Sequence, residues 1–425
     1  MEILFKNVTA VTMDEHMILQ NTNIGVKNGL ITFLGEPGPN TRVIDCTDKV
    51  LIPGLYNCHA HTPMSLLRGY ANDRSLEDWL FNFIFPAEQK IKEIPGAVYN
   101  GAMLSIAEMI ASGTIFFNDM YFGLPDIAKA VETSGVKANL SNAVLSFDPD
   151  GYDYTQTSEY SDTMHVLENY HNQIHGRIKA EASIHCAYTS HPGAWRQVSD
   201  FAKKHKLTMH VHLSETVAEH NKSLEQFNLT PAQAFATHGV FDVPTIAAHA
   251  CWVSHEDIEI LTRYDVTVAH NPVSNLKLAS GVAPITSMLE SGINVALGTD
   301  GMASNNTHDL FEEIKIASIL QKCAQESPTI VPAITALEMA TVSGAKAARR
   351  QGGVIIEGAE ADLVLLDFNT PRQVPCFDPV VSLAYSTTGK DVCMTLCQGH
   401  VLYENGEFLT IDIERVMSEV KGCMM

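Results

Sequence analysis

Between residues 55 and 300, strand-like segments alternate with helix-like segments, and this pattern limits the fold more than any other feature of the chain. Helical patterns occur, for example, at Pro125–Ser134 and His255–Tyr264. The strand-like segments are Leu55–His61, Thr114–Met120, Lys137–Leu145, Lys179–Cys186, Leu207–Ser214, Thr245–Val253, Val266–Pro272 and Asn294–Asp300. Eight strands that alternate with helices predict an α/β protein with a (β/α)8 TIM barrel.

Both ends of the chain are typical of short strands and turns. Before residue 56 apolar and polar side chains alternate, and Asn28-Gly29 is typical of a hairpin turn. Short strand-like segments return after Gly353, with a second hairpin signal at Asn405-Gly406. We therefore predict that residues 1–56 and 353–425 form one small, discontinuous β-sandwich domain, and that residues 57–352 form the barrel domain.

Composition excludes several classes of partner. The 425 residues carry 28 Lys+Arg and 49 Asp+Glu, a net charge of −21, and such an acidic surface repels nucleic acids and anionic membranes. No apolar run approaches the ~20 residues that span a bilayer. The nine cysteines form no CxxC pair, so neither a zinc ribbon nor a disulfide framework is indicated. Free thiols favour a cytoplasmic location. The sequence does not determine the oligomeric state, and a homo-oligomer is possible.

Residues suited to metal binding recur where the predicted barrel strands end. His59 and His61 are two residues apart on the first strand, so both side chains point to one side. On the fifth strand, His212 lies nearer the carboxyl end than His210, which favours His212 as a ligand. His249 lies on the sixth strand, and Asp300 ends the eighth. Because active sites of such barrels form at the carboxyl ends of the strands, the four places together predict a metal site.

The chain resembles the amidohydrolase superfamily over nearly its full length, and within it the 5-methylthioadenosine/S-adenosylhomocysteine deaminases. The motifs that carry this resemblance are PGLYNCHAHTPMSLLRG (53–69), HVHLSET (210–216), AAHACWV (247–253), AHNPVSNLKLASGVAPI (269–285), VALGTDGMASNN (295–306) and EGAEADLVLLD (357–367). The resemblance implies hydrolytic deamination of an adenine nucleoside to the inosine analogue and ammonia.

The resemblance also implies the roles of individual residues. One divalent metal ion would be bound by four side chains, with zinc the first choice and Fe²⁺, Mn²⁺ or Ni²⁺ as alternatives. Glu215 would be the acid/base, His249 would assist the attacking water, and Asp300 would also take a proton. Glu88 would contact the ribose hydroxyls and His185 the nucleoside, while Glu215 and Asp300 would also meet the substrate. The four implied metal ligands are His59, His61, His212 and Asp300.

Two motifs of other metal-dependent hydrolases are missing from the sequence. Relatives with two metal ions carry a carboxylated lysine at the end of the fourth strand, whereas this chain has Ser183-Ile184-His185-Cys186 there and Lys179 at the other end of the strand. Cytidine-type deaminases use an H-x-E and P-C-x-x-C signature, and neither half occurs. We therefore expect a site with one metal ion.

Two other functions stay open at this stage. The same acid/base pair would serve an aminohydrolase of another cyclic amidine, such as guanine, a pterin or a triazine. A barrel without catalytic activity could instead act as an interaction protein, although the intact set of ligand residues argues against it. Glu88 distinguishes a nucleoside deaminase from an aminohydrolase of a free base, because a free base has no ribose for Glu88 to contact.

The segment after the third strand departs from the deaminase family. These enzymes often carry arginines there that suit a substrate carboxylate, whereas this chain has Leu140-Ser141-Asn142-Ala143 and no Arg or Lys in Ser146–Asp162. We therefore expect adenosine, 5′-deoxyadenosine or methylthioadenosine to be preferred over S-adenosylhomocysteine. Ser146–Asp162 itself is interpreted either as a lid or as a solvated loop.

Overall fold

A computed structural model describes residues 2–15, 17–32 and 40–423, and its central feature is a closed barrel of parallel strands. Five strands follow in the order β10-β11-β12-β13-β14 and five in the order β15-β6-β7-β8-β9. Glu181 alone separates β9 from β10, and Gly298-Thr299 separates β14 from β15, so the two sheets continue into each other. The strands are β6 (Leu55–His61), β7 (Thr114–Met120), β8 (Lys137–Ser141), β9 (Ile178–Ala180), β10 (Ala182–Ile184), β11 (Met209–Leu213), β12 (Thr245–His249), β13 (Thr267–His270), β14 (Val295–Leu297) and β15 (Asp300–Gly301).

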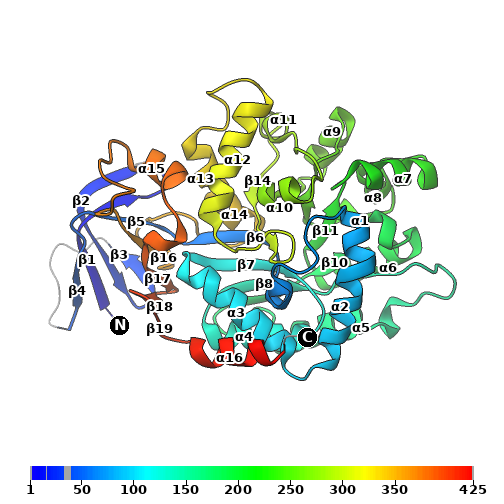
Figure 1. The fold of residues 1–425 in the computed structure, drawn as a ribbon, viewed down its shortest axis with the longest axis horizontal. Coiled ribbons are helices and arrows are strands. Elements are labelled where there is room, and N and C mark those ends of the chain that lie inside the picture. The colour runs from blue at the N-terminus through cyan, green and yellow to red at the C-terminus, as the bar shows by residue number, and fades with distance from the viewer. Residues whose placement is uncertain (1, 16, 33–39, 424–425) are drawn as a thin grey trace.

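Helices surround these strands on the outside, as Figure 1 shows. In residues 57–352 they are α1 (Leu76–Trp79), α2 (Phe85–Glu93), α3 (Ala97–Ala111), α4 (Leu124–Ser134), α5 (Ser158–Asn169), α6 (Pro192–His205), α7 (Val217–Phe227), α8 (Pro231–Thr237), α9 (His255–Arg263), α10 (Pro272–Lys277), α11 (Ile285–Glu290), α12 (Leu310–Ala324), α13 (Ala333–Ala340) and α14 (Val342–Ala347). Short 3-10 helices lie at Thr62–Leu67, Tyr154–Gln156, Ala187–Thr189 and Val240–Asp242, and a π-helical turn, Leu80–Ile84, joins α1 to α2. The predicted barrel is thus confirmed.

The two ends of the chain form one nine-stranded β-sheet beside the barrel. Its strands are β1 (Glu2–Val11), β2 (Ile18–Lys27), β3 (Leu30–Thr32), β4 (Arg42–Asp45), β5 (Lys49–Pro53), β16 (Leu363–Asp367), β17 (Val392–Cys397), β18 (His400–Glu404) and β19 (Glu407–Phe408). The N-terminal and C-terminal parts meet where β5 and β16 pair antiparallel. In Figure 1 this sheet lies to the left of the barrel.

The chain passes from the sheet into the barrel through a single residue, Gly54. A Cβ atom at Gly54 would lie 2.3 Å from the Ile115 side chain, so only glycine fits between β5 and β6. On the sheet side, an apolar core is built around Ile3, Phe5 and Leu363. A second, much larger apolar cluster fills the space between the barrel and its helices.

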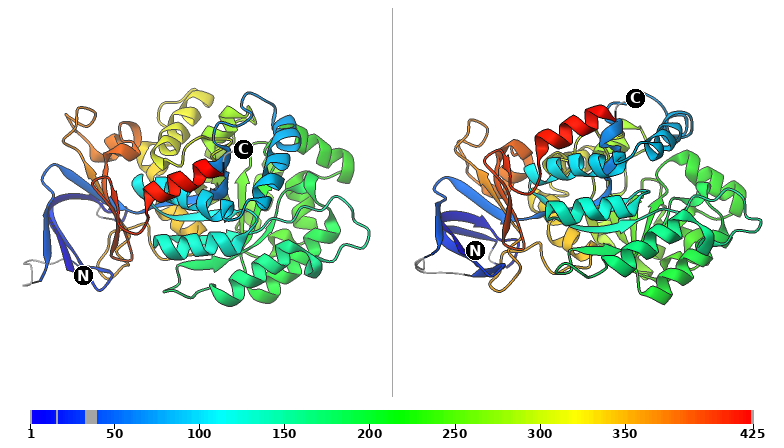
Figure 2. Two further views of the ribbon diagram at one scale, coloured as in Figure 1. Left: turned by 60° about the horizontal axis from the view of Figure 1, so that its bottom comes forward. Right: turned by 90° about the horizontal axis from the view of Figure 1, so that it is seen from below.

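The C-terminal segment also carries α15 (Pro379–Tyr385), a 3-10 turn (Gly389–Asp391) and α16 (Ile413–Gly422). Helix α16 packs against α3 on the outside of the barrel, and Figure 2 shows it lying along the barrel helices. We propose the division into residues 1–56 with 353–425 and residues 57–352 as the domain organisation. None of the helices in the described residues has the length and apolar character that a membrane span needs.

Candidate metal centre and active site

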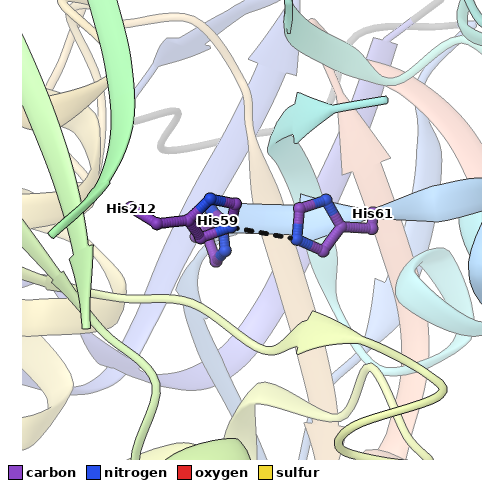
Figure 3. Close-up of side chains that lie close together, drawn as sticks. All are labelled: His59, His61 and His212. Atoms are coloured by element: carbon purple, nitrogen blue, oxygen red, sulfur yellow. Dashed lines mark hydrogen bonds between the residues drawn. The ribbon is translucent and has the colours of Figure 1, made fainter. Parts of the chain in front are cut away.

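Side chains from three strand ends converge at the carboxyl end of the barrel. His59 and His61 come from β6, His212 from β11 and Asp300 from the start of β15. One ligand atom from each of His59, His61 and His212 lies within 4.8 Å of the others, and the same holds for His59, His249 and Asp300. All of these side chains are buried. Figure 3 shows the His61 imidazole facing the His59 and His212 imidazoles, which overlap in this view.

Backbone carbonyls fix the orientation of two of the rings. His61 Nδ1 lies 2.5 Å from Met120 O, and His212 Nδ1 lies 2.8 Å from His185 O. Each Nδ1 therefore carries the proton and donates, which leaves a lone pair on each Nε2 when the ring is neutral. The two Nε2 atoms face each other at 3.4 Å, the contact drawn in Figure 3. Two lone pairs at this distance repel unless a proton or a metal cation lies between them.

Asp300 completes a set of donors that suits a divalent metal. Its Oδ1 lies 3.3 Å from His59 Nε2 and 3.1 Å from His61 Nε2. Burial opposes a charge on His61, yet the hydrogen bond and charge of Asp300 raise its pKa to about 9, so the site favours positive charge. Within the described residues His59 Nε2 is buried without a hydrogen-bond partner. Imidazole nitrogen and carboxylate oxygen are ordinary zinc ligands, so these residues fit a bound zinc ion.

The backbone around Asp300 is shaped to bring the carboxylate into this position. Asp300 has a φ of 60°, a left-handed conformation that costs a non-glycine residue about 1–3 kcal/mol. Its Oδ2 accepts hydrogen bonds from Ser274 Oγ at 2.7 Å and Ser304 Oγ at 2.8 Å. At Gly298 a Cβ atom would lie 2.8 Å from His59 Cβ, so glycine allows the strands to approach here.

Glu215 and His249 lie beside the proposed ligands. Glu215 follows β11, and its Oε1 accepts a hydrogen bond from Ser280 Oγ at 2.9 Å. Its Oε2 lies 3.8 Å from His249 Nε2, and burial raises the pKa of this carboxyl. His249 Nδ1 lies 2.8 Å from Asn275 Oδ1, which orients the ring, and the φ of 73° at His249 is again left-handed. A proton donor or acceptor thus stands next to the metal centre.

A cavity of about 390 Å³ opens in front of these groups, large enough for a small organic ligand. It is lined by His61, His212, Glu215, His249 and Asp300, together with the predicted contacts Glu88 and His185. Its apolar wall consists of Met64, Leu76, Trp79, Leu80, Phe85, Phe122, Leu145, Phe147, Tyr188 and Leu278. The structure therefore brings the predicted site residues to one cavity, except His59, which is fully buried and does not line it.

Glu88 enters this cavity from α2, directly after the π-helical turn Leu80–Ile84. Burial raises the pKa of Glu88 to about 7, although Tyr121 and the charge of His61 oppose the rise. π-Helical turns inside helices are frequent at functional sites, because they redirect the side chains that follow. His185 lies beyond β10, and burial together with the charge of His61 lowers its pKa to about 3.

The segment Ser146–Asp162 lies at the edge of the cavity. Phe147 and Glu159 line it, and α5 begins inside the segment at Ser158. Asn142 Nδ2 donates a hydrogen bond to Asp162 Oδ2 at 3.0 Å, so this side chain is already engaged within the protein. The cavity also has a basic group that the sequence analysis did not consider: Lys92, whose Nζ lies 4.4 Å from the centre of the Phe122 ring.

Sequence reasoning left several supporting residues without a role. Ser274, Asn275 and Ser280 come from the segment after β13, whose motif was recognised but not assigned residue by residue. Glu219 is buried four residues after Glu215, and its Oε2 accepts a hydrogen bond from Glu215 N at 2.7 Å. The sequence favours His212 over His210 as a metal ligand, and in the structure His210 Nε2 lies 2.9 Å from His59 Nδ1.

Comparison with known proteins agrees with this architecture. Residues 50–402 match the amidohydrolase family model. An adenosine deaminase from Xanthomonas campestris, solved with bound zinc, superposes with a TM-score of 0.92 at 28% identity, over 99% of this chain and 97% of that one. The protein therefore belongs to the amidohydrolase family, and the predicted family and fold class are confirmed.

Relatives that are similar over nearly the full length show which members of this family the chain is similar to. A 5-methylthioadenosine/S-adenosylhomocysteine deaminase from Caldanaerobacter subterraneus subsp. tengcongensis is 42% identical over 99% of this chain and 97% of its own length. A 5′-deoxyadenosine deaminase from Methanosarcina acetivorans is 40% identical over 99% of this chain and 97% of its own length. The first relative bears the name of the deaminase group that the sequence motifs resemble, and the second is named for the deamination of 5′-deoxyadenosine.

Proposed function

We propose that this protein is a hydrolytic deaminase of adenine nucleosides that depends on one divalent metal ion, most simply zinc. The observation that carries the proposal is the pair of facing Nε2 atoms of His61 and His212, 3.4 Å apart and bordered by the Asp300 carboxylate. His59, His61, His212 and Asp300 would hold the metal. When bound, a divalent metal supplies the Lewis acidity that makes water a nucleophile near neutral pH.

The residues beside the metal would move protons during the reaction. Asp300, held by two serine hydroxyls, takes a proton from the attacking water, and Glu215 donates one to the purine ring nitrogen next to the amino-bearing carbon. The raised pKa of Glu215 keeps it available as an acid. His249 hydrogen-bonds to the attacking oxygen as negative charge develops on it. A proton returned to the leaving amine then allows ammonia to depart.

The rest of the substrate would lie in the cavity. Glu88 accepts hydrogen bonds from the ribose hydroxyls, and His185 contacts the nucleoside, since both line the space in front of Glu215. We infer that Glu88→Gln lowers kcat/KM for nucleosides about 10–100-fold, because a hydrogen bond to a charged acceptor is lost in the closed site. An enzyme that acts on a free base would be affected much less by this substitution.

The 5′ group would meet a mainly apolar wall. Phe147 and Leu145 suit a hydrogen or a methylthio group, and Glu159 repels the carboxylate of S-adenosylhomocysteine. We therefore infer a preference for adenosine, 5′-deoxyadenosine or methylthioadenosine. Lys92 is a cation that would oppose this preference by attracting the substrate carboxylate. Lys92→Met therefore tests how much Lys92 contributes to activity on S-adenosylhomocysteine.

A substrate panel with metal analysis tests the function directly. Ammonia release is measured for adenosine, 5′-deoxyadenosine, methylthioadenosine, S-adenosylhomocysteine, adenine and guanine on a sample of known metal content. We expect nucleosides to react, about one zinc per chain, and loss of activity on chelation. Turnover of free bases alone would replace the proposal by a base aminohydrolase, and bound metal without turnover would favour a non-catalytic barrel.

Charge and cysteine content bear on where the protein acts. All nine cysteines are free thiols, which suits a reducing compartment. We infer a cytoplasmic enzyme that acts on a small molecule, without a nucleic-acid or membrane partner. Whether it is a homo-oligomer is measured by light scattering of the purified protein.

A further inference from the structure

A row of buried polar side chains runs through the inside of the barrel, below the metal centre. It starts at His59 on β6, whose Nδ1 lies 2.9 Å from His210 Nε2 on β11. His210 Nδ1 in turn lies 2.8 Å from the Asn118 amide on β7. All three side chains are buried, and the deamination chemistry proposed above uses neither His210 nor Asn118.

The row continues to a carboxylate between β9 and β10. The Asn118 side chain is close enough to Glu181 to lower the pKa of that carboxyl, while burial raises it to about 7 overall. Glu181 Oε1 accepts a hydrogen bond from Asn139 Nδ2 at 2.8 Å, and Asn139 Oδ1 accepts one from Arg350 Nη2 at 3.0 Å. The position of Glu181 is thus fixed from the far side.

Metal binding sets the direction of every hydrogen bond in this row. If His59 Nε2 binds the metal, it has no proton, so His59 Nδ1 must carry one and donate it to His210 Nε2. His210 must then carry its own proton on Nδ1 and donate it to Asn118. Such a donor needs an acceptor, so the carbonyl oxygen of Asn118 has to face His210.

The unpartnered atoms of the row support this direction. With the Asn118 nitrogen toward His210, Asn118 Oδ1 and Glu181 Oε2 are both buried acceptors without a hydrogen-bond partner among the described residues. The two ends of an amide have nearly the same shape, and their assignment follows from the hydrogen bonds. Turning the amide by 180° gives His210 its acceptor and frees the NH₂ group to donate to another acceptor, and Glu181 is the carboxylate whose pKa the Asn118 side chain lowers.

We propose that His210, Asn118 and Glu181 form a one-directional hydrogen-bond relay that holds His59 with its Nε2 lone pair toward the metal. The relay rests on the proposed metal-dependent function. His210 and Asn118 are positioning residues, because they act through His59 and touch no substrate. Glu181 is the terminal acceptor, comparable to the carboxylates that orient metal-binding histidines directly in other proteins.

Zinc affinity without substrate tests the relay separately from catalysis. We measure zinc dissociation by chelator competition in two variants. His210→Leu removes the acceptor of the His59 Nδ1 proton, and Asn118→Leu leaves every proposed ligand residue unchanged. We expect zinc to bind about 10–100-fold more weakly in His210→Leu and about 3–10-fold more weakly in Asn118→Leu. His210→Gln should recover part of the loss, since its side-chain oxygen can accept from His59.

The matched control is Ser183→Ala. In the native protein the Ser183 hydroxyl donates to the His210 carbonyl at 2.9 Å inside the same barrel, but it lies outside the relay. Melting of the metal-free proteins reports whether each variant is folded. Native zinc affinity in both leucine variants, or an equal loss in Ser183→Ala, would overturn the relay alone. A native protein that binds no metal would overturn the proposed function as well.

The proton positions can also be observed in the folded native enzyme. In ¹⁵N-histidine NMR spectra of the zinc-loaded protein, we expect His210 to be protonated on Nδ1 and unprotonated on Nε2. Asn118→Leu serves to assign the signal, because the Nδ1 proton loses its acceptor. A His210 ring protonated on Nε2 contradicts the proposed direction, whatever the activity of the enzyme.

Discussion

In the terminal β-sheet most buried side chains are apolar, with Thr395 on β17 an exception, whereas the barrel encloses histidines, amides and carboxylates. Ile3, Phe5 and Leu363 represent the sheet core. Within described residues 2–53, no buried side-chain polar atom lacks a hydrogen-bond partner, while several such atoms lie inside the barrel, including His59 Nε2. Buried polar groups without partners are costly. Unpartnered polar atoms inside the barrel are expected where an interior binds a ligand, and described residues 2–53 show none of them.

Left-handed backbone occurs in both regions, but in the terminal sheet it falls on residues within strands, such as Asn7 in β1 and Asn21 in β2. In the barrel, His249 at the end of β12, Ala250 directly after it and Asp300 at the start of β15 are left-handed, with φ values of 73°, 49° and 60°. Such conformations persist where the surrounding structure imposes them, and they occur at functional sites. The terminal sheet instead pairs β5 with β16 in regular antiparallel register, which ties the two ends of the chain together.

The largest expected effect is at the metal centre. Asp300→Asn replaces a charged ligand, and we expect kcat to fall at least about 10⁴-fold with loss of bound zinc, because both the ligand and the proton acceptor are removed. Metal content and ammonia release are measured on the same sample. The far-ultraviolet circular dichroism should stay native, and retained zinc with full activity would exclude Asp300 from the site.

The second effect separates proton transfer from metal binding. Glu215→Gln keeps the hydrogen bond from Ser280 but cannot donate the proton, so we expect kcat to fall about 10²–10⁴-fold with zinc content unchanged. Single-turnover deamination and metal analysis distinguish the two. Substitution of the exposed Glu225 by Gln is the control on the following helix, α7.

A substitution in the terminal sheet should lower the stability of the protein but leave catalysis and zinc binding unchanged. Leu363 is fully buried on β16, and Leu363→Ala should lower the free energy of unfolding by about 2–5 kcal/mol through loss of apolar contacts and the cavity that remains. Chemical denaturation measures the change. At 25 °C kcat and zinc affinity of the folded fraction should match the native enzyme, and a parallel loss of both would show that the sheet supports the site directly.

The smallest effect concerns pH. Burial raises the pKa of Glu219 to about 8, so the folded protein holds a proton that the unfolded chain releases near pH 4.5. This stabilising contribution is present below that pH and is lost as the pH rises toward 8, with a slope of at most about 1.4 kcal/mol per pH unit. Melting of metal-free Glu219→Gln between pH 5 and 8.5 should depend less on pH than native melting.

The control for this pH dependence is again Glu225→Gln, which lies on the same helix with its carboxyl in solvent. Its melting temperature should follow the native curve at every pH. If Glu219→Gln also follows that curve, Glu219 is charged in the folded protein throughout the range, and the burial of its carboxyl is compensated by the amide of Glu215.

Much of the barrel was predictable because its signals are local. Strands such as β6 and β7 are short buried runs, and their predicted bounds differ from the structure by a few residues at most. The third and sixth strands both end four residues before their predicted ends: β8 stops at Ser141 rather than Leu145, where Asn142 bonds Asp162, and β12 stops at His249 rather than Val253. Side-chain contacts with a distant segment decide such endings, and sequence periodicity does not contain them.

By itself the sequence determined the residue types at each strand end, and the two-residue spacing determined that His59 and His61 share one side. Only the tertiary structure decided that His210 supports His59 from below while His212 faces His61. Both follow from how far each residue lies along β11 relative to β6, two strands that are not neighbours, because the stagger between successive strands accumulates around the barrel. That stagger depends on the closure of all the strands, so it can be determined only from the complete barrel.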